Sequence, residues 1–300
     1  MPNLSDIRRK ISETQAQDVL RRKYLKKLYD LVKRDVILYA TNFSQPKPNI
    51  PGNSLIINDS DVQHLMSVIS ELRRSDNSRS DKLDLILHSP GGSLAAAEQI
   101  VCYLRKQYKH IRVIVPQNAM SAATMIACAA DEVLMGHHSA LGPTDPQVAN
   151  AGHYFAAHSI INEFNKAKEE TKIDISTLPL WTTRISNWPP GLLDDCARAI
   201  ELSQKMVADW LHKYMRLSQS EATKAAALLA NANEHKTHNR PLDFDKLKSF
   251  NLNVKRLEED QDLQDAVLSV FHATTVTFET TLCVKIVENH LGKGVYQVMT

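Results

Sequence analysis

The sequence has little glycine, few cysteines, no long apolar segment and almost no net charge. Its 300 residues include 9 glycines, four cysteines without a CxxC spacing, and 36 basic against 34 acidic side chains. The cysteine pattern argues against a disulfide framework or a zinc site and indicates thiols of a reducing compartment. A net charge of +2 gives no overall basic surface for nucleic acid. The longest weakly polar run, Ala119 to Ala130, is too short to span a bilayer.

The remaining composition is that of an ordinary globular chain. It is 43% hydrophobic and 23% charged, which argues against a disordered, collagenous or membrane-spanning protein. No apolar stretch follows the charges near Met1, so we expect no secretory signal and a cytoplasmic location. We expect no integral membrane segment and no nucleic-acid partner.

The centre of the chain has the pattern of an α/β core. Three short apolar runs, Leu83–His88, Ile111–Pro116 and Glu132–Gly136, are separated by two segments of helical character, 93–106 and 121–130. Short continuous apolar runs separated by helices are typical of buried parallel strands with crossover helices. The sequence therefore predicts consecutive βα units.

Helical periodicity dominates on both sides of this core. Leu20, Tyr24, Leu28 and Val32 recur at helical spacing and predict a helix over about 14–34. A strand over 35–43 and a helix from about 59 to 74 follow it. Beyond Pro146 the chain is predicted mostly helical, over about 157–171, 190–215, 218–231, 243–250 and 262–290. We therefore expect an N-terminal helical arm (1–34), a catalytic domain (35–255) and a C-terminal helical extension (256–300).

Two turns could carry chemistry, because both follow predicted parallel strands at the edge where open α/β sheets bind ligands. The first is Ser89-Pro90-Gly91-Gly92. Adjacent glycines can aim bare backbone N–H groups at a ligand. The same pattern also fits a tight turn that merely starts a helix.

The second turn carries Ser121, which lies between the second apolar run and a helix. A serine on a sharp strand-to-helix turn is the setting of a nucleophile elbow, although the G-x-S-x-G form is absent. The following amide, of Ala122, could donate to an oxyanion. The alternative is that Ser121 only caps the helix.

Five ordered blocks between residues 89 and 147 resemble the ClpP/crotonase superfamily, and most closely the serine dehydrogenase proteinase (SDH proteinase) family, relatives of signal peptide peptidases. The blocks are Ser89-Pro90-Gly91-Gly92-Ser93, Ala96-Ala97-Glu98-Gln99-Ile100, Ala119-Met120-Ser121, Ala129-Ala130-Asp131-Glu132-Val133 and Leu141-Gly142-Pro143-Thr144-Asp145-Pro146-Gln147. The resemblance implies a ClpP/crotonase-like spiral of ββα units and self-association. It also implies a catalytic Ser121 with an oxyanion hole from the amides of Gly91 or Gly92 and Ala122.

The general base is left open by the sequence. The ClpP pattern places a histidine near Thr144 and an aspartate near Asn239, and neither position matches. The signal peptide peptidase relatives instead use a lysine several tens of residues downstream of the serine. Lys166 and Lys168 lie 45 and 47 residues beyond Ser121 and are the predicted bases. Such a lysine must be neutral, which requires burial; two solvated surface lysines, or His238 as the base, are the alternatives.

The sequence thus predicts a cytoplasmic serine peptidase that forms homo-oligomers, acts on peptide or protein substrates and needs no cofactor or metal. Two other functions remain possible. One is a crotonase-type acyl-CoA enzyme, whose thioester enolate the same backbone donors could stabilise. The other is a catalytically inactive scaffold or adaptor, which Ala122 and Ala123 favour because relatives often have glycine just after the nucleophile.

Overall fold

The computed structural model describes residues 7, 17–45, 47–48, 50–75, 80–150 and 153–299. Its centre is a seven-stranded sheet with the strand order β11-β10-β1-β2-β3-β5-β9. From β1 to β9 each neighbouring pair is parallel, whereas β10 runs antiparallel to β1 and β11 antiparallel to β10. The predicted α/β architecture is confirmed. The strand bounds are β1 Asp35–Thr41, β2 Lys82–His88, β3 His110–Val115, β5 Glu132–Met135, β9 Val254–Arg256, β10 Cys283–Asn289 and β11 Gly294–Val298.

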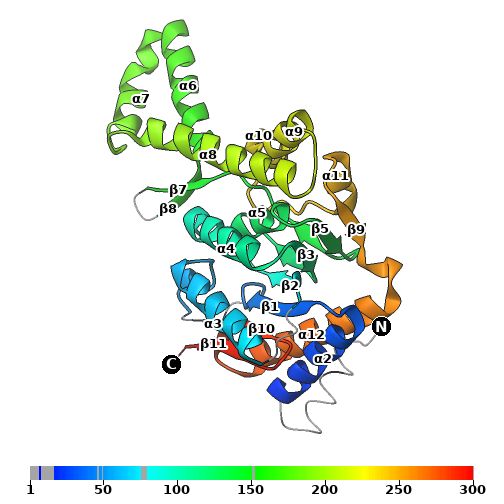
Figure 1. The fold of residues 1–300 in the computed structure, drawn as a ribbon. Coiled ribbons are helices and arrows are strands. Elements are labelled where there is room, and N and C mark those ends of the chain that lie inside the picture. The colour runs from blue at the N-terminus through cyan, green and yellow to red at the C-terminus, as the bar shows by residue number, and fades with distance from the viewer. Residues whose placement is uncertain are drawn as a thin grey trace.

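Both faces of this sheet are buried, because its strands are apolar at successive positions. In β1, Ile37 and Tyr39 face one core and Val36, Leu38 and Ala40 face the other. The first core is covered by α3 (Asp59–Ser75), α4 (Leu94–Gln107) and α5 (Ala122–Cys128). The second is covered by α2 (Gln17–Val32) and α12 (Gln261–Thr280), which pack side by side in Figure 1. A sheet between two helical layers holds its strand ends rigidly.

A second layer of short strand segments follows the long strands and gives the fold its ββα repeat. The loop after β1 pairs through Ile57 with Gly92, and the loop after β2 pairs through Ser89 with Ala119. The latter residue belongs to β4 (Asn118–Ala119), which pairs with β6 (Ala140–Leu141). Strands β1, β2, β3 and β5 are thus each followed by a short extended segment, and after β1, β2 and β3 a helix comes next. The loops that carry Gly92 and Ser121 are therefore hydrogen-bonded to each other.

The segment after β6 is mostly helical and projects from the central sheet (Figure 1). A hairpin of β7 (Gln147–Asn150) and β8 (His153–Ala156) leads into α6 (Ala157–Ile173), which pairs with α7 (Leu178–Ile185) in the projecting arm at the top of Figure 1. The sequence predicted α6 and α8 (Leu192–Lys213) but not the hairpin or α7. The shorter elements of the chain are η1 Gly52–Ser54, η2 Ile175–Thr177, α9 Gln219–Leu229, α10 Ala232–His235, α11 Phe244–Ser249 and η3 Leu257–Glu259.

The C-terminal segment is only half helical, so the predicted helix over 262–290 is wrong beyond Thr280. Helix α12 ends there, and the following residues form β10 and β11. Strand β10 pairs with β1 inside the central sheet. Its charged residues Lys285 and Glu288 are buried and paired with distant side chains, so its sequence lacks the apolar run that marked the other strands.

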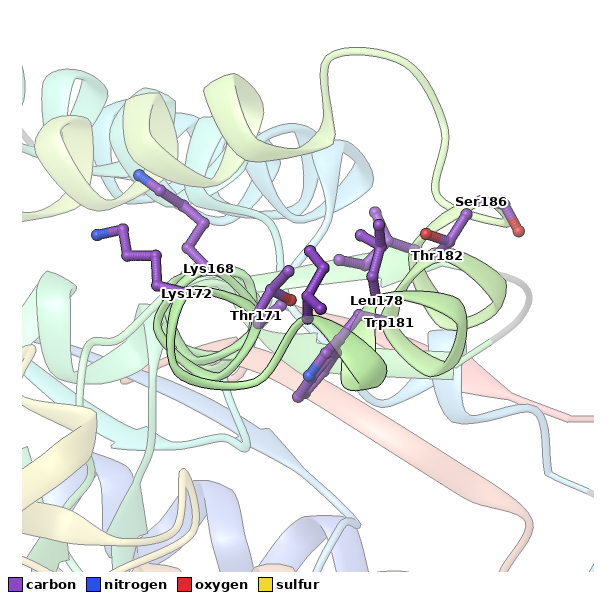
Figure 2. Close-up of a pocket in the computed structure, with 10 residues that line it drawn as sticks. Lys168, Thr171, Lys172, Leu178, Trp181, Thr182 and Ser186 are labelled. Atoms are coloured by element: carbon purple, nitrogen blue, oxygen red, sulfur yellow. The ribbon is translucent and has the colours of Figure 1, made fainter.

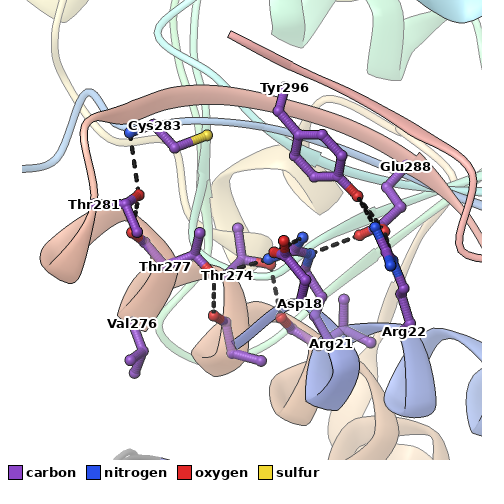
Figure 3. Close-up of polar contacts among 12 residues, drawn as sticks. Asp18, Arg21, Arg22, Thr274, Val276, Thr277, Thr281, Cys283, Glu288 and Tyr296 are labelled. Carbon is purple, nitrogen blue, oxygen red and sulfur yellow. Dashed lines mark hydrogen bonds and ion pairs between the residues drawn. The ribbon is translucent and has the colours of Figure 1, made fainter. Parts of the chain in front are cut away.

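A buried ion pair joins the N-terminal helix to this C-terminal strand. Arg21 of α2 donates to Glu288 Oε2 at 2.6 Å and to the hydroxyl of Thr277 at 2.8 Å, and both charged side chains are fully buried (Figure 3). Arg22 and Tyr296 also donate to Glu288. The cluster therefore ties α2, α12, β10 and β11 together.

Arg21→Met removes one partner of this buried pair and leaves the Glu288 carboxylate short of a donor. Removing a single partner of a buried pair destabilises proteins by about 3–5 kcal/mol. We expect a loss of that size in the free energy of unfolding, measured by urea denaturation. Lys26→Met is the control, because the pair of Lys26 with Asp30 is half exposed and should contribute under about 1 kcal/mol. Equal losses in both variants contradict the prediction.

Within the described residues, no helix combines the length and apolar composition needed to cross a membrane.

Candidate active site

A cavity of about 790 Å³ opens at the carboxyl ends of the central strands. Ser121 and Ala122 line it from the start of α5, and Gly92 lines it from the loop after β2. Asp145 and His238 complete it from two loops far apart in the sequence. The cavity thus collects a hydroxyl, backbone amides, an imidazole and a carboxylate.

Ser121 occupies a strained turn between β4 and α5. Its φ of 51° and ψ of −119° lie in a region that non-glycine residues rarely adopt, and such positions cost about 1–3 kcal/mol and cluster at functional sites. Its side chain makes no capping hydrogen bond to the helix. The capping role considered from the sequence is therefore not what the structure shows, and the half-buried hydroxyl lines the cavity.

Gly91 and Gly92 bring the neighbouring loop against this turn. Gly91 has a φ of +94°, and a Cβ atom there would lie 2.6 Å from both Met120 O and Ser121 Cβ. Only glycine allows such a close approach. The Gly91 amide donates to Ser89 Oγ at 3.2 Å, so it points inward and away from the cavity.

The Gly92 amide points the other way. Ile57 bonds to the residues on either side of Gly92, because its N–H donates to Gly91 O at 2.7 Å and its carbonyl accepts from Ser93 N at 2.8 Å. In a parallel bridge of this kind the amide of the central residue faces away from the partner segment. Of the two glycines, only Gly92 lines the cavity.

A second backbone amide, that of Ala122, is presented by the first residue of helix α5. The first amides of a helix have no intrahelical acceptor and carry the positive end of the helix dipole. No acceptor within the described part of the chain is assigned to the amide of Ala122 or to that of Gly92. The two N–H groups can therefore stabilise an anionic oxygen placed beside Ser121.

His238 and Asp145, which also line the cavity, form a pair. His238 Nδ1 lies 2.9 Å from Asp145 Oδ1, and the carboxylate is 1% exposed. A buried carboxylate on Nδ1 fixes the ring with its proton on that side, which leaves Nε2 as the proton acceptor. This arrangement can supply a general base oriented by a third group, which is what an activated serine requires.

The loops that carry this pair are fastened to each other and to α8. Leu141 and Leu242 exchange two backbone hydrogen bonds, of 3.0 and 2.8 Å. Ser203 Oγ of α8 donates to Thr144 O at 2.8 Å, and the side chain of Gln147 donates to Asp145 Oδ2 at 3.0 Å. These bonds place Asp145 next to His238 although 93 residues separate them.

The two predicted lysines lie elsewhere. Lys166 is 66% exposed and pairs with Glu170 at 3.6 Å, and neither lysine lines the cavity of Ser121. Lys168 lines a separate apolar cavity between α6 and α7, where its amine extends away from Leu178 and Trp181 (Figure 2). Within one chain the structure therefore gives no support to either lysine as the base.

Asp145 was not assigned a role from the sequence. It belongs to the Gly-Pro-Thr-Asp-Pro block and is the only ionisable residue in it, and a carboxylate within an otherwise uncharged turn was the available signal. The ClpP pattern expects a histidine near 144 and an aspartate near 239. This chain instead has an aspartate at 145 and a histidine at 238, so both residue types are present in exchanged order.

A second histidine, His88, ends β2 just before the turn at residues 89–92 and is neutral near pH 7. His88 Nδ1 accepts from the Asn118 amide at 3.4 Å, and Nε2 lies 3.2 Å from Ser44 Oγ. Burial lowers the pKa of His88 to about 4, because the ring packs against Phe43 and Phe271 away from water. A neutral ring satisfies both contacts, so His88 supports the segment before Ser121.

Protonation of His88 should weaken the fold in mild acid. Its pKa is about 4 in the folded chain and about 6.5 when unfolded. The unfolded state therefore binds the proton first, and stability falls as the pH drops from about 6.5 to 4, by up to about 3 kcal/mol. We expect urea midpoints of His88→Gln to decline less between pH 7 and 4.5 than those of the wild type. His138→Gln, at an exposed position, should decline as the wild type does; parallel curves for all three proteins contradict the prediction.

Metal ligands are not gathered in the described part of the chain. No three or more His, Cys, Asp or Glu side chains there lie close enough together to hold a metal ion.

A sheet built from ββα repeats, with a strained serine at the start of a helix, defines the ClpP-like class of α/β proteins. The chain belongs to the ClpP-like SDH-type serine proteinase family, which residues 54–263 match. The family predicted from the sequence motifs is therefore confirmed.

The chain is also similar to two uncharacterized proteins of Methanocaldococcus jannaschii. One is 36% identical over 141 residues, which are 44% of this chain and 48% of that protein. The other is 33% identical over 172 residues, 57% and 51% of the two chains. The chain spans about half the length of these relatives. A solved ClpP1 mutant from Listeria monocytogenes covers 78% of this chain and 97% of its own, at 13% identity and a TM-score of 0.41.

Proposed function

We propose that the protein is a serine peptidase in which Ser121 is the nucleophile and His238, oriented by Asp145, is the general base. The observation that carries this proposal is the single cavity that Ser121 shares with the His238–Asp145 pair and the Gly92 amide. Membership of a serine proteinase family supports the peptide bond as the target.

The proposed reaction uses these groups in turn. Nε2 of His238 takes the proton from Ser121 Oγ as that oxygen attacks the peptide carbonyl. The carbonyl oxygen becomes an anion and receives hydrogen bonds from the Gly92 and Ala122 amides, which are fixed before the reaction begins. His238 then returns the proton to the leaving amine. A water molecule, deprotonated by the same ring, releases the acyl group from Ser121.

A histidine base explains the structure better than a lysine base. A lysine accepts a proton only when neutral, and burial away from other charges is what makes it neutral. Lys166 is instead exposed and paired with the Glu170 carboxylate. His238 requires no burial to act as a base, and its ring already contacts the Asp145 carboxylate that would orient it.

The lining of the cavity also argues against the acyl-CoA alternative. The phosphates of coenzyme A call for cationic side chains, yet none of the described residues that line the cavity is a lysine or an arginine. Its walls carry uncharged groups such as Ile56, Leu94, Met125 and Asn53. Such walls suit the neutral backbone and apolar side chains of a peptide.

A homo-oligomer and a cytoplasmic location stay part of the proposal. The arm of α6 and α7 exposes apolar side chains, among them Ile173 and Leu180 at 86% and 75%. Apolar groups gathered on a projecting arm are the kind of surface that self-association covers.

Covalent labelling tests the proposed nucleophile directly. A biotinylated fluorophosphonate reacts with serines that a base has activated, and mass spectrometry of the digested adduct identifies the residue. We expect the phosphonyl group on Ser121. Wild-type protein that takes up no label, or takes it up on another serine, contradicts the proposal.

A further inference from the structure

We infer that a buried lysine on the C-terminal strand, Lys285, acts with Asp61 and Tyr39 as a positioning device for the Gly92 amide. The inference rests on the proposed function, since it concerns the oxyanion hole of that same site. None of the three residues lines the cavity. They act through the loop that follows β1.

The ammonium group of Lys285 is fully used. Its Nζ lies 2.8 Å from both oxygens of Asp61 and 2.9 Å from Ile56 O, which are three acceptors for its three protons. Lys285 is 1% exposed and Asp61 is fully buried. A buried charge is tolerated only with such complete pairing, so the lysine defines where Ile56 lies.

Asp61 fixes the other side of the same loop. Its Oδ2 accepts from the Asn58 amide at 2.9 Å and from the hydroxyl of Tyr39, on β1, at 2.9 Å. His64 Nδ1 lies 3.4 Å from Oδ1. The loop is therefore held at Ile56 and at Asn58, the two residues that flank Ile57.

Ile57 in turn determines the position of Gly92. Its N–H and carbonyl bond to Gly91 and Ser93, and a Cβ atom added to Gly92 would overlap the backbone of Ile57. Gly92 therefore rests directly on Ile57, with its amide facing the cavity. Lys285 and Asp61 hold Ile56 and Asn58, the two residues that flank Ile57. Ile57 in turn bonds to Gly91 and Ser93, the two residues that flank Gly92. This chain of contacts connects Lys285 to the proposed oxyanion donor.

This device predicts an effect on the transition state and not on substrate binding. The Gly92 amide bonds the oxygen only when that oxygen becomes an anion, so a displaced amide lowers kcat and kcat/KM together while KM changes little. Loss of one oxyanion donor typically lowers kcat about 100- to 1000-fold. A shifted donor should lose less, so we expect about a 30-fold fall.

The test variant removes both charges at once, Lys285→Met with Asp61→Asn, so that no buried charge is left unpaired. The matched control is Arg21→Met with Glu288→Gln. That pair is equally buried and also holds β10, but its contacts run to α2, α12 and β11 and not to the loop at Ile57. Hydrolysis of p-nitrophenyl butyrate is measured at a temperature where thermal melting shows each protein folded.

We expect kcat to fall about 30-fold in the test variant and to stay within about threefold of the wild type in the control. Equal falls in both variants, no fall in either, or a rise in KM at unchanged kcat overturns the inference. If the test variant does not fold, Tyr39→Phe replaces it, because this change removes one bond to Asp61 and leaves both charges; an unchanged kcat there overturns the inference as well. Hydrolysis that survives Ser121→Ala shows that the proposed function itself is wrong.

Discussion

Ser121→Ala should abolish fluorophosphonate labelling and lower peptide hydrolysis by more than about 1000-fold. The substitution deletes only the hydroxyl that is proposed to attack the carbonyl, and serine hydrolases keep only a small residual rate from their oxyanion donors. Ser121 has a positive φ without a stabilising side-chain hydrogen bond to its helix, so the alanine variant should fold as stably as the wild type. Labelling intensity, release of a fluorogenic peptide product and the urea midpoint are the three measurements.

Ser93→Ala is the matched control for this experiment. Ser93 lines the same cavity, but its hydroxyl caps α4 by accepting from Ala96 N at 3.2 Å. Loss of such a cap costs about 1 kcal/mol of stability. The two serines should thus behave oppositely, with activity lost at 121 and stability lost at 93. A Ser93→Ala protein that takes up no label, or a Ser121→Ala protein that does, would show that Ser121 is not the nucleophile.

His238→Ala should reduce kcat by about 1000-fold while leaving the fold intact. General-base catalysis contributes about 100- to 10,000-fold, and among the described residues that line the cavity His238 has the only imidazole. The His238 ring is partly exposed, so its removal leaves little empty volume. Steady-state hydrolysis of the same peptide, compared at one pH, gives the ratio.

Lys166→Ala and Lys168→Ala discriminate between the two candidate bases. Both side chains lie on the outer helix α6, away from the cavity, so both variants should stay within about twofold of the wild-type kcat. A 1000-fold loss in either variant, together with an active His238→Ala protein, would restore the lysine dyad and require that the lysine reach Ser121 from another copy of the chain.

The centre of the fold could be predicted from the sequence because its signals are local. The apolar runs at 83–88, 111–116 and 132–136 became β2, β3 and β5 within one residue at each end. Ser121 could be singled out for the same reason, since a serine between a buried strand and a helix is visible in a short window. The two glycines were found, but which of them faces the cavity depends on Ser89 Oγ and Ile57, and these contacts form only in the folded chain.

The proposed general base could not be derived locally, because it depends on a pair of residues 93 positions apart in the sequence. Asp145 and His238 are brought together by the two bonds between Leu141 and Leu242 and by Ser203 of α8. Sequence spacing instead favoured Lys166 and Lys168, because their separation from Ser121 along the chain resembles the serine-to-lysine spacing of the signal peptide peptidase relatives. The hairpin of β7 and β8 and the projecting helix α6 carry both lysines away from Ser121, so the number of residues between them does not predict their distance in space.

The terminal strands were missed for an electrostatic reason. Strand β10 carries Lys285 and Glu288, whose charges interrupt the apolar run that marks the other strands. Each is neutralised by a partner far away, Asp61 in α3 and Arg21 in α2. Pattern analysis scores a charge as outward-facing, whereas this sheet buries charges in complementary pairs.

The insertion of β10 beside β1 has a consequence for synthesis on the ribosome. Strand β1 is made early, but the edge at which β10 pairs with it stays open until Cys283–Asn289 emerges from the exit tunnel. Pairing between strands so distant in sequence forms late in folding. A growing polypeptide should consequently remain without a finished central sheet until Cys283–Asn289 has left the tunnel, and the proposed hydrolytic activity should not appear before then.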